Sequence, residues 1–117
     1  MNQKNILPFL TLFNEKYAGI NFDYKETMQW LTINKPIAMS WGISDLTPIG
    51  RKGLLFFVNG YIHKGWILIT LEGDDTYTVR LLEIGSFNLI KETKMVYCDV
   101  LQTVIDKDVE KDSNTPS

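Results

Sequence analysis

The sequence predicts an α+β fold with two N-terminal helices, a mainly antiparallel sheet of four or five strands, and a C-terminal helix packed on one face. Apolar residues recur at helical spacing in the first and last thirds of the chain. Runs rich in β-branched, aliphatic and aromatic residues fill the middle, as in strands. Turn signals divide these runs into a central meander, at Asn59-Gly60, His63-Lys64-Gly65 and Gly73-Asp74-Asp75.

Two helices are expected before the sheet. Residues 5–18 carry apolar side chains at helical spacing and end before Gly19, a residue that favours helix termination. Residues 24–31 form the second helix, because Asp23 and Glu26 have the spacing of a capping box that satisfies free backbone donors of a first turn.

The segment between the helices and the meander is expected to contain one strand. Asn34-Lys35-Pro36 reads as the stop of the second helix. Residues 37–43 are predicted to form the first strand, although Gly42 weakens it. Residues 44–52 are polar, contain Pro48, and are predicted to be a connection.

The register of the meander has two alternatives. A three-residue loop at 63–65 would place Ile62 opposite Trp66, whereas a turn at Asn59-Gly60 would place Val58 opposite Tyr61. In both, the central strand is apolar on its two faces, so both faces need cover. Helices of the same chain, a second copy or a partner protein could supply it. The strands of the meander are predicted at 54–58, 66–71 and 76–82.

The last third of the chain is expected to add a short strand at 87–93 and an amphipathic helix at 97–111. Residues 1–110 form one predicted domain, and 111–117 a flexible polar tail.

Composition favours a protein of the cytoplasm that does not contact membranes. The net charge of −2 provides no global attraction for nucleic acid or anionic lipid. A single cysteine, Cys98, excludes an intramolecular disulfide and any multi-thiolate metal site. No signal peptide and no apolar run of membrane-spanning length is evident. No cofactor and no metal are expected.

The preferred functional hypothesis is a small non-enzymatic interaction module that binds a protein or a second copy through an uncovered sheet face. The candidate binding residues are Phe57, Tyr61 and Trp66, with His63 and Lys64 at the rim. In the favoured register Phe57 and Tyr61 share a face and Trp66 lies on the other.

Two alternatives come from other functional classes. Nucleic-acid binding would use the same aromatic side chains for stacking and Arg51, Lys52 and Lys64 for phosphates. Catalysis would need Cys98 or His63, but no set of acid, base and nucleophile can be assembled around either residue from the sequence, so a non-enzyme is predicted.

Three groups of residues resemble small proteins of bacterial mobile elements and phages that have no assigned activity. The resemblance covers roughly residues 53–110 and implies an accessory or host-interaction role, with no catalytic or binding residue attached. The residues that carry it are Val58-Asn59-Gly60 with His63-Lys64-Gly65-Trp66, Asp75-Thr76-Tyr77-Thr78-Val79, and Val96-Tyr97-Cys98-Asp99 with Ile105-Asp106.

Overall fold

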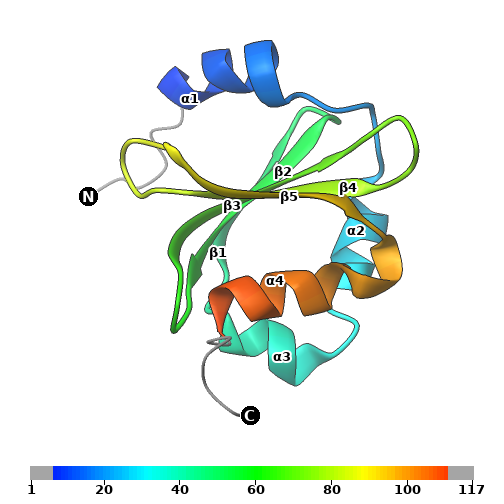
Figure 1. Ribbon diagram of the computed structural model, residues 1–117, viewed down its shortest axis with the longest axis vertical. Helices are drawn as coiled ribbons and strands as arrows, with labels where there is room; N and C mark the ends of the chain where they lie inside the picture. Colours follow the sequence, from blue (N-terminus) through cyan, green and yellow to red (C-terminus); the bar gives the residue numbers. More distant parts are fainter. Residues whose placement is uncertain (1–6, 111–117) are drawn as a thin grey trace.

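The computed structural model describes residues 7–110, which form an α+β fold with the helices on both sides of one sheet (Figure 1). The predicted fold class is confirmed, while the predicted tail at 111–117 and the first two residues of the helix predicted at 5–18 lie outside the described residues. Before the sheet come α1 (Leu7–Leu12), its π-helical continuation η1 (Phe13–Tyr17), α2 (Tyr24–Leu31) and α3 (Lys35–Ser40). The sheet contains β1 (Ser44–Ile49), β2 (Gly53–Asn59), β3 (Lys64–Leu71), β4 (Tyr77–Leu82) and β5 (Leu89–Val96), followed by η2 (Cys98–Val100) and α4 (Leu101–Val109).

The five strands pair antiparallel in sequence order, β1-β2-β3-β4-β5, so the predicted meander is the centre of the sheet. The β2–β3 register pairs Phe57 with Trp66 and Asn59 with Lys64. The loop is therefore 60–63, and both expected registers are wrong. Phe57 and Trp66 share a face because directly paired residues of antiparallel strands point the same way.

One face of the sheet packs against α2, α3 and α4, which Figure 1 shows below the sheet. Side-chain hydrogen bonds fix these helices to each other: Trp41 Nε1 donates to Asp106 Oδ1 at 3.0 Å, and Gln102 Nε2 donates to the carbonyl of Leu31 at 2.8 Å. The fully buried sheet residues of this face are Leu54, Phe56, Val58, Ile67, Ile69 and Val79. We call it the three-helix face.

The opposite face packs against α1 and η1 alone, so we call it the one-helix face (Figure 1). Its core is largely aromatic. Phe9 stacks on Phe87 with ring centroids 4.8 Å apart, and Trp66 stacks on Phe87 at 5.6 Å. Thus the sheet is covered on both faces by helices of its own chain, which resolves the alternative that the sequence left open.

The segment 34–49 differs from its prediction. Asn34 does not end a helix but begins α3: its side chain accepts from the Ile37 amide at 3.3 Å, and Pro36 lies in the first turn, where a missing amide costs nothing. Residues 37–43 are therefore largely helical, and the expected connection contains β1 instead. Proline is tolerated there because β1 is an edge strand.

Candidate functional site

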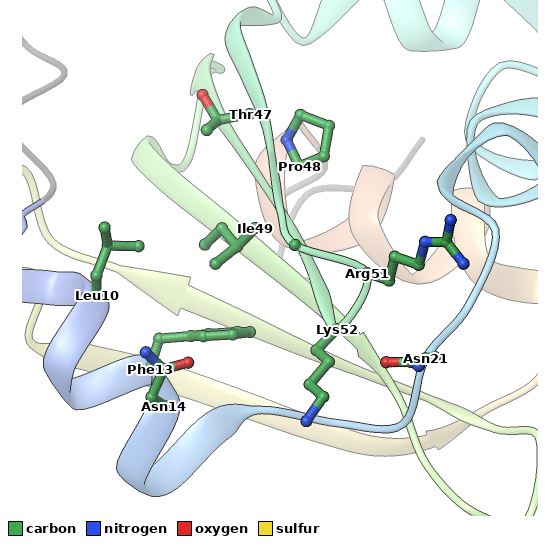
Figure 2. A pocket seen from close by; sticks show the side chains of 10 residues that line it. Leu10, Phe13, Asn14, Asn21, Thr47, Pro48, Ile49, Arg51 and Lys52 are labelled. Carbon is green, nitrogen blue, oxygen red and sulfur yellow. The ribbon is translucent and has the colours of Figure 1, made fainter.

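A surface groove of about 630 Å³ lies where the β1–β2 turn meets the N-terminal helix and the linker that follows it (Figure 2). Three elements contribute: α1 with η1, the linker 18–23, and β1 with its turn. The lining residues are Leu10, Phe13, Asn14, Asn21, Thr47, Pro48, Ile49, Gly50, Arg51 and Lys52.

Backbone hydrogen bonds hold the turn that carries the two cations. The carbonyl of Lys52 accepts from the Gly19 amide at 3.3 Å, and that of Arg51 accepts from the Phe22 amide at 2.8 Å. Within the turn, the Lys52 amide donates to the carbonyl of Ile49 at 3.2 Å. The linker is thus fixed to the turn, and the groove wall is rigid in its main chain.

The groove combines an apolar floor with polar and cationic walls. Phe13 is buried, Leu10 and Ile49 are half-buried, and Arg51 and Lys52 are exposed. Figure 2 shows Lys52 reaching towards the linker segment that carries Asn21. Among residues 7–110, the side chains of Arg51 and Lys52 have no hydrogen-bond or ion-pair partner. No Asp or Glu lines the groove within that range.

A second hollow of about 580 Å³ adjoins the groove and shares Asn21, Gly50 and Arg51 with it. It adds Asp23, whose carboxylate is already engaged, because Oδ1 accepts from the Lys25 amide at 2.9 Å and caps α2. Arg51 therefore lines both the groove and the second hollow. Asp23, whose carboxylate already accepts a hydrogen bond, lines only the second hollow.

The predicted aromatic site is corrected by the burial of its main members. Phe57 is 5% exposed and Trp66 is 1% exposed. Their rings meet edge to face with centroids 5.3 Å apart in the core of the one-helix face. These two side chains cannot contact a partner while the protein is folded.

The other predicted residues lie around the β2–β3 loop. Tyr61 is 84% exposed and Lys64 is exposed, but His63 is buried, with Nε2 3.2 Å from the carbonyl of Trp66. Burial lowers the pKa of His63, and the hydrogen bond to Trp66 and the charge of Asp108 oppose this shift. The loop is held to the end of α4, because the Ile62 amide donates to the carbonyl of Val109 at 2.8 Å.

The three predicted phosphate-binding cations do not form one patch. Arg51 and Lys52 precede β2, whereas Lys64 pairs with Asn59 at the other end of that strand. Seven residues of extended chain separate them, a distance of about 20 Å at roughly 3.3 Å per residue.

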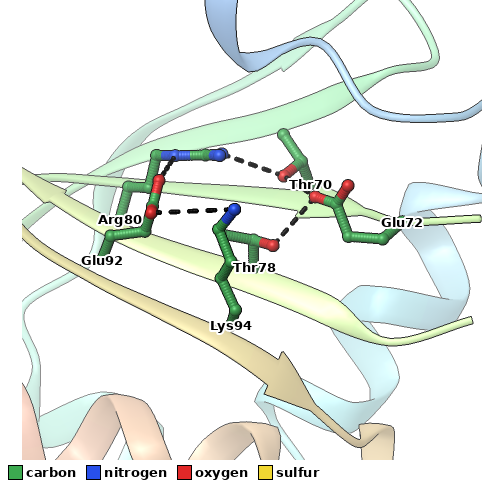
Figure 3. Close-up of polar contacts among 6 residues, drawn as sticks. All are labelled: Thr70, Glu72, Thr78, Arg80, Glu92 and Lys94. Carbon is green, nitrogen blue, oxygen red and sulfur yellow. Dashed lines mark hydrogen bonds and ion pairs between the residues drawn. The ribbon is translucent and has the colours of Figure 1, made fainter. Parts of the chain in front are cut away.

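A polar network on the one-helix face was not predicted from the sequence (Figure 3). Arg80 is 6% exposed; its Nε donates to Glu92 Oε2 at 2.7 Å and its Nη1 donates to Thr70 Oγ1 at 3.2 Å. The guanidinium carbon lies 4.5 Å from the centroid of the Tyr17 ring, a cation–π contact. The signal in the sequence was a charged residue, Arg80, inside the largely apolar run that forms β4, but its partners Thr70 and Glu92 are distant in the chain.

Cys98 and His63 are not brought together. Cys98 follows β5 near Val96, which pairs with Tyr77 at the start of β4, whereas His63 lies near Trp66, which pairs with Leu82 at the end of β4. Within the described chain, no three His, Cys, Asp or Glu side chains are grouped to hold a metal ion. In the same range no helix is both long enough and apolar enough to cross a bilayer.

Comparison with protein families, with curated proteins and with solved structures found no match.

Proposed function

We propose that this protein is a small non-enzymatic interaction module of the cytoplasm, and that its groove binds an extended acidic segment of another protein. The observation that carries the proposal is the pair of exposed cations, Arg51 and Lys52, which have no side-chain partner among residues 7–110 and lie beside an apolar floor. By contrast, Arg80 and Lys91 are engaged by Glu92 and Asp108 at 2.7 Å each.

The chemistry of the groove favours a segment in which acidic residues alternate with apolar ones. Leu10 and Ile49, both half-buried, offer apolar surface, whose burial contributes roughly 25 cal/mol per Å². Arg51 and Lys52 would pair with carboxylates at the rim, where charges chiefly govern association rate and partner choice. Asn14 and Asn21 add carboxamides that can hydrogen-bond to an extended backbone.

Nucleic-acid binding has less support. The aromatic residues expected to stack on bases, Phe57 and Trp66, are buried, and Lys64 is remote from Arg51 and Lys52. Two cations alone would neutralise few phosphates and would therefore make a weak site.

The test is an NMR titration of ¹⁵N-labelled protein with an acetylated and amidated peptide of alternating Glu and Leu residues. Amide shifts should concentrate at Asn14, Asn21, Arg51 and Lys52. The double variant Arg51→Glu/Lys52→Glu should weaken binding by about tenfold or more, because two attractions become repulsions, and tenfold equals about 1.4 kcal/mol.

Lys64→Glu is the matched control, since it changes one exposed cation at the start of β3, remote from the groove, and should leave peptide affinity within about twofold. A peptide of alternating Lys and Leu should not bind. Shifts confined to other elements, or binding unaffected by the double variant, would refute the proposed site. Preferential binding of oligo-dT, lost in the same double variant, would assign the groove to nucleic acid instead.

A further inference from the structure

The two edges of the sheet differ in how far they can accept another strand. β1 has six residues, contains Pro48, and is irregular between Ser44 and Thr47, where Asp45 has a φ of 53°. A proline has no amide donor and therefore obstructs the addition of a further strand at β1. β1 is therefore a protected edge.

The other edge, β5, is longer and open. It has eight residues, none of them proline, and its only backbone pairing among the described residues is with β4. That pairing is also irregular in two places, and Met95 has a φ of 60°. Every side chain of β5 except those of Thr93 and Val96 is exposed, including Leu89, Ile90 and Met95 at 45%, 53% and 57%. An edge that exposes apolar side chains beside free backbone groups is suited to strand addition.

The charges of β5 are complementary to those of an antiparallel copy of itself. Glu92 and Lys94 point to the one-helix face, since Glu92 binds Arg80 and Lys94 Nζ lies 4.0 Å from Glu92 Oε1 (Figure 3). If two β5 strands pair about a two-fold axis through Thr93, each Glu92 lies directly opposite Lys94 of the second copy. Opposite charges in directly paired positions stabilise a sheet, as does a Thr–Thr pair.

Neighbouring two-fold registers lack this complementarity. An axis through Glu92 places two carboxylates opposite each other, and axes through Lys91 or Lys94 oppose two ammonium groups. Like charges in directly paired positions are destabilising. Among the two-fold registers centred on residues 91–94, charge therefore favours the one centred on Thr93.

We infer that the protein self-associates through β5, with a second copy of this chain as the occupant of the open edge. The two copies form one continuous ten-stranded antiparallel sheet around a two-fold axis at Thr93. Each Glu92 then lies between Arg80 of its own chain and Lys94 of the other, and the groove at the opposite edge stays open in both copies.

Sedimentation velocity over a range of protein concentrations tests the association. The mass should rise from 13.5 kDa towards twice that value as concentration increases. Lys94→Glu should weaken association about tenfold or more, because each new carboxylate lies opposite Glu92. Lys107→Glu makes the same change of net charge on the exposed surface of α4 and should alter the association constant by less than about twofold.

Disulfide trapping tests the register. In a Cys98→Ser background, Thr93→Cys should give a covalent dimer with oxidised glutathione, whereas Lys107→Cys should give about tenfold less under the same conditions. A monomer at all concentrations would overturn the inference. Stronger association of Lys94→Glu would also overturn it, by showing that the lysine protects the edge instead of pairing across it.

Discussion

The two faces of the sheet are buried by very different amounts of helix. On the three-helix face, α2, α3 and α4 cover apolar strand residues and are tied to each other by side-chain hydrogen bonds. On the one-helix face, α1 and η1 cover an aromatic cluster that extends to Tyr17. Beyond that ring the strands carry Thr70, Thr78 and Arg80.

The difference shows that the residue types on each sheet face follow the amount of helix that packs over that face. At the same level of the sheet, the three-helix face has Ile69 and Val79, both fully buried. The one-helix face replaces such residues by hydroxyls and a guanidinium, so Thr78 Oγ1 donates to Glu72 Oε2 at 2.8 Å (Figure 3). The polar network satisfies the buried polar groups at this end of the face, where the Tyr17 ring of η1 covers the Arg80 guanidinium.

The largest effect is expected at the centre of the one-helix face. Trp66→Ala should lower the free energy of unfolding by about 3–5 kcal/mol, because it leaves a cavity between Phe57 and Phe87. Urea denaturation followed by circular dichroism measures it. Tyr61→Ala, at an 84% exposed position, is the control and should cost less than about 0.5 kcal/mol. A small loss for Trp66→Ala would mean that this face contributes little to stability.

The polar end of the same face should give a smaller effect. Arg80→Ala leaves Glu92 without its buried partner, and we expect a loss of about 2 kcal/mol, reduced from the value for a fully buried pair because Glu92 reaches solvent. Arg80→Ala/Glu92→Ala should lose less than the sum of the single variants. Additive losses in urea denaturation would show that the two residues act independently.

On the three-helix face, helix capping can be varied alone. Asp23→Ala removes the acceptor for the Lys25 amide and should cost about 1 kcal/mol. Asp23→Asn retains an acceptor and should cost only a few tenths of that. Equal losses for both variants in thermal denaturation would show that charge, and not capping, is what Asp23 contributes.

The smallest effect is a pH dependence at His63. Burial holds its pKa below the ordinary value of 6.5, so the folded state binds fewer protons than the unfolded state. The stability that the protein has with His63 neutral is therefore fully present above pH 6.5, and it is lost progressively as the pH falls below that value, because the unfolded state then binds the proton more readily. His63→Gln should flatten the stability curve between pH 7 and 5, measured by urea denaturation, while leaving any loss near the ordinary Asp pKa of 3.8 unchanged. An unchanged slope would contradict the burial effect.

The meander could be predicted because each strand is a continuous run bounded by turn residues. β1 could not be predicted, because Pro48 and the polar residues around it resemble a loop. These residues are compatible with a strand only because β1 lies at the edge of the sheet. α3 was missed because Pro36 was interpreted as a helix stop, although proline in a first turn is equally typical of a helix start.

The candidate site was only partly predictable. Arg51 and Lys52 were selected as exposed cations, and the structure agrees with their exposure. Asn14 and Asn21 were missed, because they reach the groove only through the docking of α1, η1 and the linker on the β1–β2 turn. Phe57 and Trp66 were misplaced because one sheet face was expected to be uncovered, whereas α1 and η1 pack over it.

The sequence order of the strands also bears on how the protein folds. Each of the four strand pairings closes a short loop, so none has to wait for distant segments to meet. Proteins dominated by such local contacts fold faster than those with long-range strand pairings. We expect hairpin formation to precede the docking of α1 and α4, which lie far from each other in the chain yet pack on opposite sides of the same strands.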